Sequence, residues 1–376
     1  MEKYIVSSAP YLRNADRGHS TRNLMNDLLI ALSPVILFSI YKNVIMVLIN
    51  GGYTSIYQAI YPLITLIVGP LFSVLLEALC LWIMKKANNF KDMVSELKVS
   101  FGIFPGLFIV LTSPVYIPMW ILLVSIAVGE VVGKMLFGGF GQNIFNPALV
   151  GRAFMAFAFS TEVSGAYLNA YELSIDSFAG ATPLINYAKQ TTITYENIVA
   201  NYGSLWNFFL GTIPGSLGET SVLAILIGYI YLTVRKVIDW KVPIIYVGTV
   251  FLITLIAGGI MGQGIWYPLF QIFSGGLMFG AVFMATEPVT MPKSYLGRIM
   301  SAMMLGVLTV LFRLVGGLPE GVATTIVTMN IFGLVIDKYV IHMRVDGRVD
   351  KKDVPGLVIF LIIFIGLFIY DIVEIV

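Results

Sequence analysis

Cysteine and histidine are nearly absent from this chain of 376 residues, which contains one cysteine, Cys80, and two histidines, His19 and His342. A single cysteine cannot form an internal disulfide, and it cannot supply the several thiolates that an iron–sulfur cluster needs. With so few histidines, we also expect no metal site. If the protein handles electrons, its cofactor must be organic or must belong to a partner.

Charged residues are also scarce, at 12% of the chain against about 25% in average soluble proteins. Hydrophobic residues reach 58%, and the mean hydropathy is +0.88. The net charge of +2 gives no sign of a nucleic-acid partner. This composition indicates an integral membrane protein embedded in the lipid bilayer.

The start of the chain lacks the apolar core of a signal peptide. Residues 1–23 are mainly polar, so we expect them to remain as a cytoplasmic N-terminal tail. After them come about eleven apolar runs, several of them shorter than the roughly 20 residues that cross a bilayer as a helix. None of these runs alternates as the strands of a membrane barrel would. We therefore expect an all-α integral membrane protein.

Lysine and arginine predict the orientation, because cytoplasmic loops carry an excess of these residues. They gather in the N-terminal tail, in residues 85–98, 235–241 and 293–298, and in a basic loop at residues 341–355. All of these segments lie on one side if the N-terminus is cytoplasmic. Residues 161–204 then form an extracytoplasmic loop, in which four acidic residues accompany one lysine, Lys189.

An internal repeat is indicated by the pattern T-x-P-V-x-x-P, which begins at Thr112 and again at Thr286, 174 residues later (286 − 112). By the charge distribution, the first copy ends an outward segment and the second an inward one. We therefore predict about ten core transmembrane helices in a 5 + 5 inverted repeat with broken helices. Residues 24–160 form the first half and residues 205–340 the second, and residues 356–376 add a C-terminal helix.

The stretch GGFGQNIFNPALVGRAF, residues 138–154, places several polar residues at the start of a short apolar segment. Asn146 and Pro147 suit a helix N-terminus. A helix that starts inside the membrane presents its N–H groups to an anionic or polar ligand. The alternative is a re-entrant turn whose side chains only satisfy its own backbone. The sequence leaves both interpretations open.

Ionisable residues inside apolar runs are costly and therefore suggest function. Glu287 and Glu320 are the preferred candidates for an ion path, because they sit at the ends of broken segments in the second half. The candidates of this kind are Glu77, Glu130, Arg152, Glu287, Arg313, Glu320 and Asp337.

The extracytoplasmic loop contains DSFAGATPL, residues 176–184. Thr182 follows two small residues and precedes Pro183, which keeps its backbone accessible. No histidine is near to activate the hydroxyl, so the loop is not catalytic by itself. It is either a simple turn or a site that another enzyme modifies.

Several motifs together resemble the RnfD/NqrB family, in the order in which that family has them. They include the residue 138–154 stretch, GSLGETS, FMATEPVT and PEGVATTIVTMNIFGLVID, and they cover nearly the whole chain. In that family a D-x-x-S/T-G-A-T motif carries FMN, which a flavin transferase links through its phosphate to the last threonine. Here Asp176, Gly180, Ala181 and Thr182 match this motif, and Ala179 departs from it.

This resemblance implies a subunit that binds flavins and is catalytic only within a complex of the bacterial cell (inner) membrane. Thr182 would carry covalent FMN, and a second, non-covalent flavin such as riboflavin would lie among the helices. Asn143, Asn146 and Arg152 are its candidate ligands. Partner subunits with iron–sulfur clusters and flavins would pass electrons from ferredoxin to NAD+, coupled to Na+ or H+ translocation.

Three alternatives remain at this point. The first is the B-type subunit of a Na+-translocating NADH:quinone reductase, and the second is a flavinylated subunit that passes electrons to extracellular acceptors. The third is a cofactor-free transporter on the same inverted-repeat scaffold, since fold does not fix function.

Overall fold

The computed structural model describes residues 20–51, 55–87, 89–167, 183–184, 187, 193–318, 321–344 and 354–376. Within these residues the secondary structure is helical and contains no strand, apart from one isolated bridge between Pro114 and Ser216. The prediction of an all-α membrane fold is confirmed. The predicted site residues Asp176, Gly180, Ala181, Thr182 and Glu320 lie outside the described part of the chain.

The first half of the chain begins with a long helix that contains a π-helical turn. Serine side chains cap the starts of α1 and α3, accepting hydrogen bonds from Asn23 N and Gln58 N. The elements are α1 (Thr21–Ile40), η2 (Tyr41–Ile45), α2 (Met46–Asn50), α3 (Ile56–Ile83), α4 (Phe90–Ser100), α5 (Ile103–Thr112), α6 (Met119–Ala127), η3 (Val128–Val132), η4 (Met135–Phe137), α7 (Pro147–Ala158) and α8 (Ser160–Gly165).

The second half also contains π-helical turns, η6 and η7. Ser221 and Ser294 cap α12 and α16. The elements are α10 (Tyr195–Ile198), η5 (Ala200–Tyr202), α11 (Leu205–Leu210), α12 (Val222–Val234), α13 (Lys241–Ile260), α14 (Trp266–Phe273), α15 (Leu277–Phe279), η6 (Gly280–Met284), α16 (Tyr295–Val310), η7 (Leu311–Val315), α17 (Val322–Arg344) and α18 (Val354–Ile375).

Six of the described helices are long and apolar enough to span a membrane, or eight if each bent pair forms one span. The bent pairs are α4 with α5, at 49°, and α14 with α15 and η6, at 66°. The helices α7 and α12 are apolar but shorter. The number of spans and the internal repeat therefore stay predictions.

The two bends contain Gly102 and Gly276, which are 174 residues apart (276 − 102). This is the same separation as that between Thr112 and Thr286. The turn after Thr112 bonds through Ser113 to the loop at residues 211–221, which also contacts Lys42. The turn at Thr286 instead lines a cavity with Thr21, the first residue of α1. The two turns thus lie near different parts of the α1–α2 helix, one near its start and one near Lys42.

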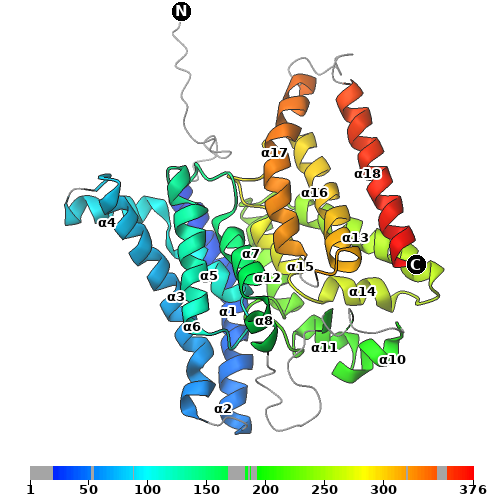
Figure 1. The fold of residues 1–376 in the computed structure, drawn as a ribbon, viewed down its shortest axis with the longest axis horizontal. Coiled ribbons are helices and arrows are strands. Elements are labelled where there is room, and N and C mark those ends of the chain that lie inside the picture. Colours follow the sequence, from blue (N-terminus) through cyan, green and yellow to red (C-terminus); the bar gives the residue numbers. More distant parts are fainter. Residues whose placement is uncertain are drawn as a thin grey trace, which may run out of the picture.

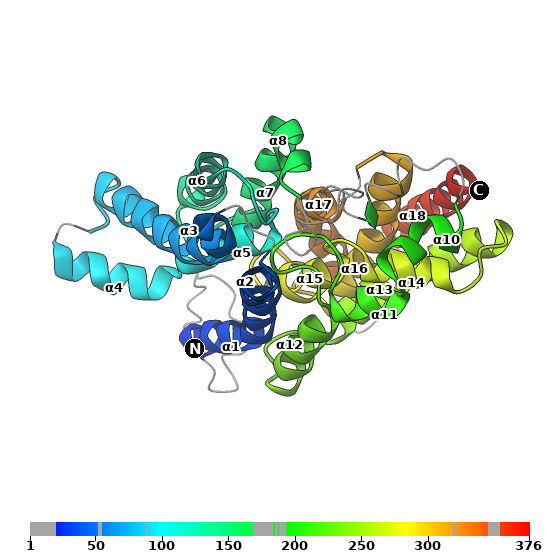
Figure 2. The ribbon, with the colours of Figure 1, turned by 90° about the horizontal axis from the view of Figure 1, so that it is seen from below.

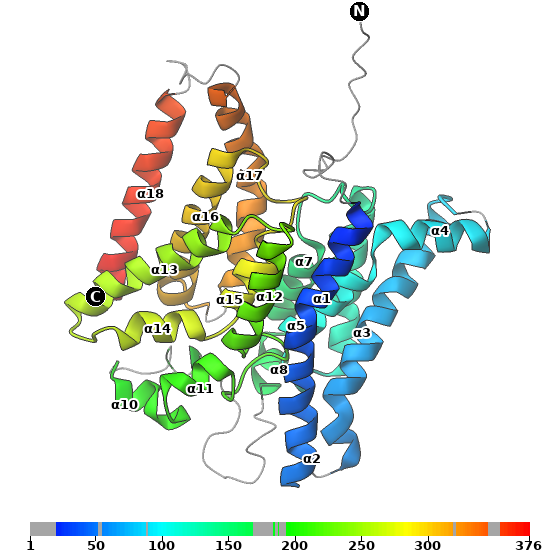
Figure 3. The same ribbon diagram turned by 180° about the vertical axis from the view of Figure 1, so that it is seen from behind.

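The helices of the two halves lie largely to either side of the molecule. Figure 2 shows α3, α4, α5 and α6 on one side and α13, α14, α16, α17 and α18 on the other, with α1, α7, α12 and α15 between them. The start of α1, α4, the end of α17 and the start of α18 lie toward one end (Figures 1 and 3). The opposite end carries α2, α8, α10 and α11.

Candidate functional site

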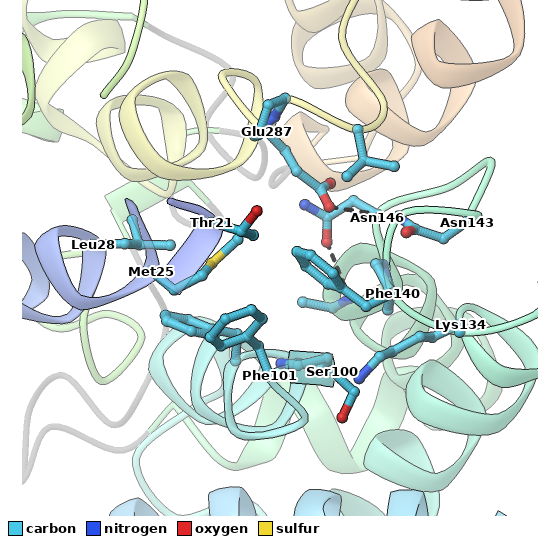
Figure 4. A pocket seen from close by; sticks show the side chains of 18 of the residues that line it. Thr21, Met25, Leu28, Ser100, Phe101, Lys134, Phe140, Asn143, Asn146 and Glu287 are labelled. Atoms are coloured by element: carbon cyan, nitrogen blue, oxygen red, sulfur yellow. Dashed lines mark hydrogen bonds between the residues drawn. The ribbon is translucent and has the colours of Figure 1, made fainter. Parts of the chain in front are cut away.

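A cavity of about 440 Å³ opens between the two halves near the start of α1. Its walls come from α1, from the junction of α4 and α5, from the loop before α7, and from the turn after η6. This volume is typical of small-molecule sites, which span about 300–1,000 Å³. Figure 4 shows how side chains from these separate segments converge on it.

The loop before α7 contributes two asparagines to the wall. Asn146 caps α7, and its Oδ1 accepts hydrogen bonds from Ala148 N (3.0 Å) and Leu149 N (3.3 Å). Pro147 follows as the first helical residue, where its missing N–H costs nothing. Asn143 Nδ2 donates to Phe145 O at 2.9 Å. Asn146 therefore caps α7, as its position before Pro147 suggests, and both asparagines also line the cavity.

Glu287 reaches the same cavity from the second half. Its Oε1 accepts a hydrogen bond from Asn143 Nδ2 at 3.5 Å, and its Oε2 accepts one from Thr290 Oγ1 at 3.1 Å. In Figure 4 the Glu287 carboxylate points toward Asn146 and Asn143. Removal from water raises the pKa of this carboxyl, in the turn beyond η6, to about 7. The structure thus brings together three predicted site residues that the sequence could not connect.

Aromatic side chains form the apolar part of the cavity wall. Phe101 and Phe140 meet edge to face with their ring centroids 5.3 Å apart, and Phe104 and Met25 continue this surface. Phe101 ends α4 in the left-handed region, with φ of 54°, and so marks the bend into α5. An apolar aromatic wall with a few polar groups suits a planar ligand that has hydrogen-bonding edges.

Lys134 is a wall residue that the sequence analysis did not single out. Its Nζ lies 2.5 Å from Glu77 Oε1 and 2.8 Å from Glu130 Oε1, and all three side chains are buried. Ser73 Oγ donates to the second oxygen of Glu130 at 3.0 Å. The signal in the sequence was the i, i+4 spacing of Glu130 and Lys134 within an apolar run. Glu77 comes from α3 and has no such local signal.

Arg152 occupies a different place from the asparagines. It does not line the cavity, and its Nε donates to the carbonyl of Thr112 at 2.9 Å. Its Nη2 donates to Tyr167 Oη at 2.8 Å. A cation at the last carbonyls of α5 is favourable because of the helix dipole. In the structure Arg152 therefore ties α7 to the end of α5.

Asp337, another ionisable residue noted in the sequence, caps the start of α16. Its carboxylate accepts hydrogen bonds from Lys293 N (2.7 Å), Ser294 N (3.1 Å) and Ser294 Oγ (2.9 Å). Arg313 lies buried in η7, where its Nη1 donates to Gln271 O at 2.6 Å. Neither residue lines the cavity.

Comparison with known proteins gives a match over most of the chain. The NQR2, RnfD, RnfE family matches residues 5–346. The D subunit of the proton-translocating ferredoxin:NAD(+) oxidoreductase complex of Clostridium ljungdahlii is 32% identical over 337 residues, which are 89% of this chain and 94% of the relative.

The B subunit of the Na(+)-translocating NADH-quinone reductase is also similar. In Chromohalobacter salexigens it is 36% identical over 249 residues, which are 64% of this chain and 58% of the relative. In Ectopseudomonas mendocina it is 37% identical over 264 residues, which are 68% of this chain and 63% of the relative. The chain thus aligns with less than two thirds of each of these two relatives.

Proposed function

Because the chain belongs to the NQR2, RnfD, RnfE family, we propose that it is the flavin-carrying D-type membrane subunit of an Rnf-type complex. Such a complex couples electron transfer from ferredoxin to NAD+ to the translocation of Na+ or H+, and this subunit would act only with its partners. Alignment over 94% of the D-type relative, against 58% of a B-type one, favours the D type. The observation that carries the proposal is the cavity that joins Asn143, Asn146 and Glu287.

We propose that Thr182 carries FMN on the extracytoplasmic side. A flavin transferase would join the Thr182 hydroxyl to the FMN phosphate of FAD and release AMP. The match of Asp176, Gly180, Ala181 and Thr182 to the family motif supports this assignment. The nearest described helices around the loop, α8 and α10, lie at the end of the molecule opposite the start of α1. With the basic α4 end in the cytoplasm, this end faces outward.

The cavity fits the second, non-covalent flavin. Phe101 and Phe140 would lie against the ring system, while Asn143 and Lys134 would meet its polar edges. A bound flavin supplies one- and two-electron transfer, and the protein supplies binding and electrostatics. Glu287, on the same wall, would accept the coupling ion at a position between the two halves, with Glu320 as a further candidate on the path.

Covalent attachment is tested by mass analysis of peptides from protein made together with a flavin transferase. We expect an FMN-sized adduct on the peptide that contains Thr182 and none in the Thr182→Ala variant. Thr192→Ala, in the same loop, should keep the adduct. If no adduct forms while a known target in the same preparation is modified, the cofactor-free transporter becomes the better interpretation.

The non-covalent flavin is tested by extraction from purified Phe140→Ala protein. The variant loses one aromatic contact with the flavin, which contributes about 1 kcal/mol to binding. We therefore expect it to retain less than roughly half of the extractable flavin. The fluorescence of covalently attached flavin on denaturing gels should stay unchanged. Phe157→Ala, which removes a ring that is 61% exposed on α7 and lies outside the cavity, should retain the extractable flavin. Equal retention in both variants would place that flavin elsewhere.

A further inference from the structure

Asp371 is the single fully buried residue in the apolar span Val358–Ile375 of α18, and 0% of it is exposed. Every other residue of this span is exposed or half-buried. The helix lies beyond residues 5–346, which match the family, so the family match gives it no role. A carboxyl within a membrane-spanning helix is costly, and its burial here therefore suggests a function.

The face of α18 that carries Asp371 is turned toward the rest of the protein. Half-buried residues of this helix pack against the main hydrophobic core, namely Phe364, Phe368, Ile372 and Ile375. They recur at helical spacing with Asp371, so they share one face of the helix. α18 packs against α13, α16 and η7, and Figure 1 shows it beside α16 and α13. The carboxyl of Asp371 is therefore enclosed between helices.

No group in the described part of the chain compensates this carboxyl. Neither of its oxygens has a hydrogen-bond partner there, and no lysine or arginine forms an ion pair with it. A buried carboxylate that has neither a partner nor water is strongly disfavoured, whereas the neutral carboxyl is disfavoured much less. The packed position of Asp371 therefore favours its protonated form.

The titratable residues on the elements that α18 contacts bond to other groups. These residues are Lys241 and Tyr246 on α13, Tyr295 and Arg298 on α16, and Arg313 on η7. Their bonds are those of Lys241 to Tyr295, of Arg298 to Asp239, of Tyr246 to Thr309, and of Arg313 to the carbonyl of Gln271. On α18 itself, Tyr370 and Glu374 are exposed. None of these side chains bonds to Asp371.

The enclosed site suits a proton better than a metal ion. A metal cation needs several oxygen ligands, and the described residues contain no group of three or more carboxylate, histidine or cysteine side chains that could hold one. A proton needs only the carboxyl. Asp371 lies four residues (375 − 371) before Ile375, the last residue of α18, which is about 6 Å along the helix axis. Because a spanning helix ends near the membrane surface, a small separation of α18 would bring this carboxyl to water.

We propose that Asp371 is a proton-binding site, and that its protonation controls the packing of α18 against α13, α16 and η7. With the proton bound, the neutral carboxyl stays within the contact. When the proton passes to water, the carboxylate follows it into a hydrated position, and α18 separates from the core. The inference does not depend on the flavin assignment, because α18 carries none of the residues proposed to hold a flavin.

The first test compares the thermal stability of full-length wild type and Asp371→Asn as a function of pH. The packed state binds a proton that the separated state releases, so wild type loses stability as the pH rises, and the neutral asparagine does not. We expect the Tm of Asp371→Asn relative to wild type to increase by about 2 °C or more between about pH 5 and pH 9. Glu287 titrates in both proteins, so its effect cancels.

Glu374→Gln is the matched control, because Glu374 is an exposed carboxyl on the same helix. Its Tm relative to wild type should not change with pH. Asp371→Leu is a second uncharged variant should Asp371→Asn fail to fold, and it fits the apolar contact. A difference between wild type and the uncharged variants that is constant across this pH range would overturn the inference.

The second test measures the packing of α18 directly. Spin labels are attached at Leu252→Cys on α13 and Ile363→Cys on α18, which are 53% and 48% exposed, in a Cys80→Ser background that removes the only native cysteine. With Asp371 present, the distance between the labels should lengthen or broaden from pH 5 to about pH 9. With Asp371→Asn it should stay constant. The same distance at both pH values in the presence of Asp371 would show that its protonation does not control the helix.

Discussion

Replacing Glu287 by glutamine is expected to reduce ion translocation by roughly tenfold or more, since removal of a proton-accepting group usually costs at least this much. Flavin content should change little. The glutamine amide keeps the size of the side chain and can still bond to Thr290 and Asn143, so the two halves stay joined. The measurement is ion uptake driven by electron transfer in vesicles that contain the assembled complex.

The pKa of Glu287, raised to about 7 by its removal from water, adds a pH dependence. The carboxylate that accepts a cation is the majority form above this pH and the minority form below it. Cation uptake at Glu287 should therefore fall as pH drops through about 7. Electron transfer without ion coupling should not follow this curve.

Glutamine is neutral at every pH, so the variant also escapes the cost of a desolvated carboxylate. When the pKa of a carboxyl is raised in the folded state, the protein loses stability as the pH rises through that pKa. Glu287→Gln should thus be at least as stable as wild type above pH 7. Glu96→Gln, at an exposed residue of the same cavity, is the matched control and should transport normally. If Glu287→Gln transports ions at the wild-type rate, Glu287 is not part of the ion path.

The fold could be predicted from the sequence where local chemistry decides it. The apolar runs, the capping role of Asn146 and Pro147, and the broken segment ends near Thr112 and Thr286 are local features, and the structure bears them out. The bends at Gly102 and Gly276 have the same separation along the chain as Thr112 and Thr286. The number of membrane spans is harder to predict, because bent pairs and short helices have no single hydrophobic length.

The site could be predicted only in part, because its contacts are distant in the sequence. Asn143 and Glu287 were both candidates, but they are 144 residues apart and no local pattern shows that they meet. Lys134 was missed for another reason: a lysine near the end of an apolar run usually extends its ammonium to the membrane surface. Its burial with Glu77 depends on α3, which places that carboxylate 57 residues earlier in the chain (134 − 77).

Replacing Lys134 by methionine is expected to have the largest effect on stability. Methionine fills similar space, but it leaves Glu77 and Glu130 fully buried without their cation. Breaking a buried ion pair from one side typically costs about 3–5 kcal/mol. The thermal stability of the detergent-purified protein and its yield should both fall sharply. Lys86→Met, at an exposed lysine that donates to Gly138 O, should lose little.

A neutral version of the whole cluster separates charge from packing. When Glu77→Gln and Glu130→Gln are added to Lys134→Met, no uncompensated carboxylate remains, and neutral replacements of buried ion clusters are often tolerated. We therefore expect the triple variant to regain more than half of the lost thermal stability. A triple variant as unstable as Lys134→Met alone would mean that the lysine supports the fold through its packing. Recovery would mean that Lys134 is required for its interaction with the two buried carboxyl groups.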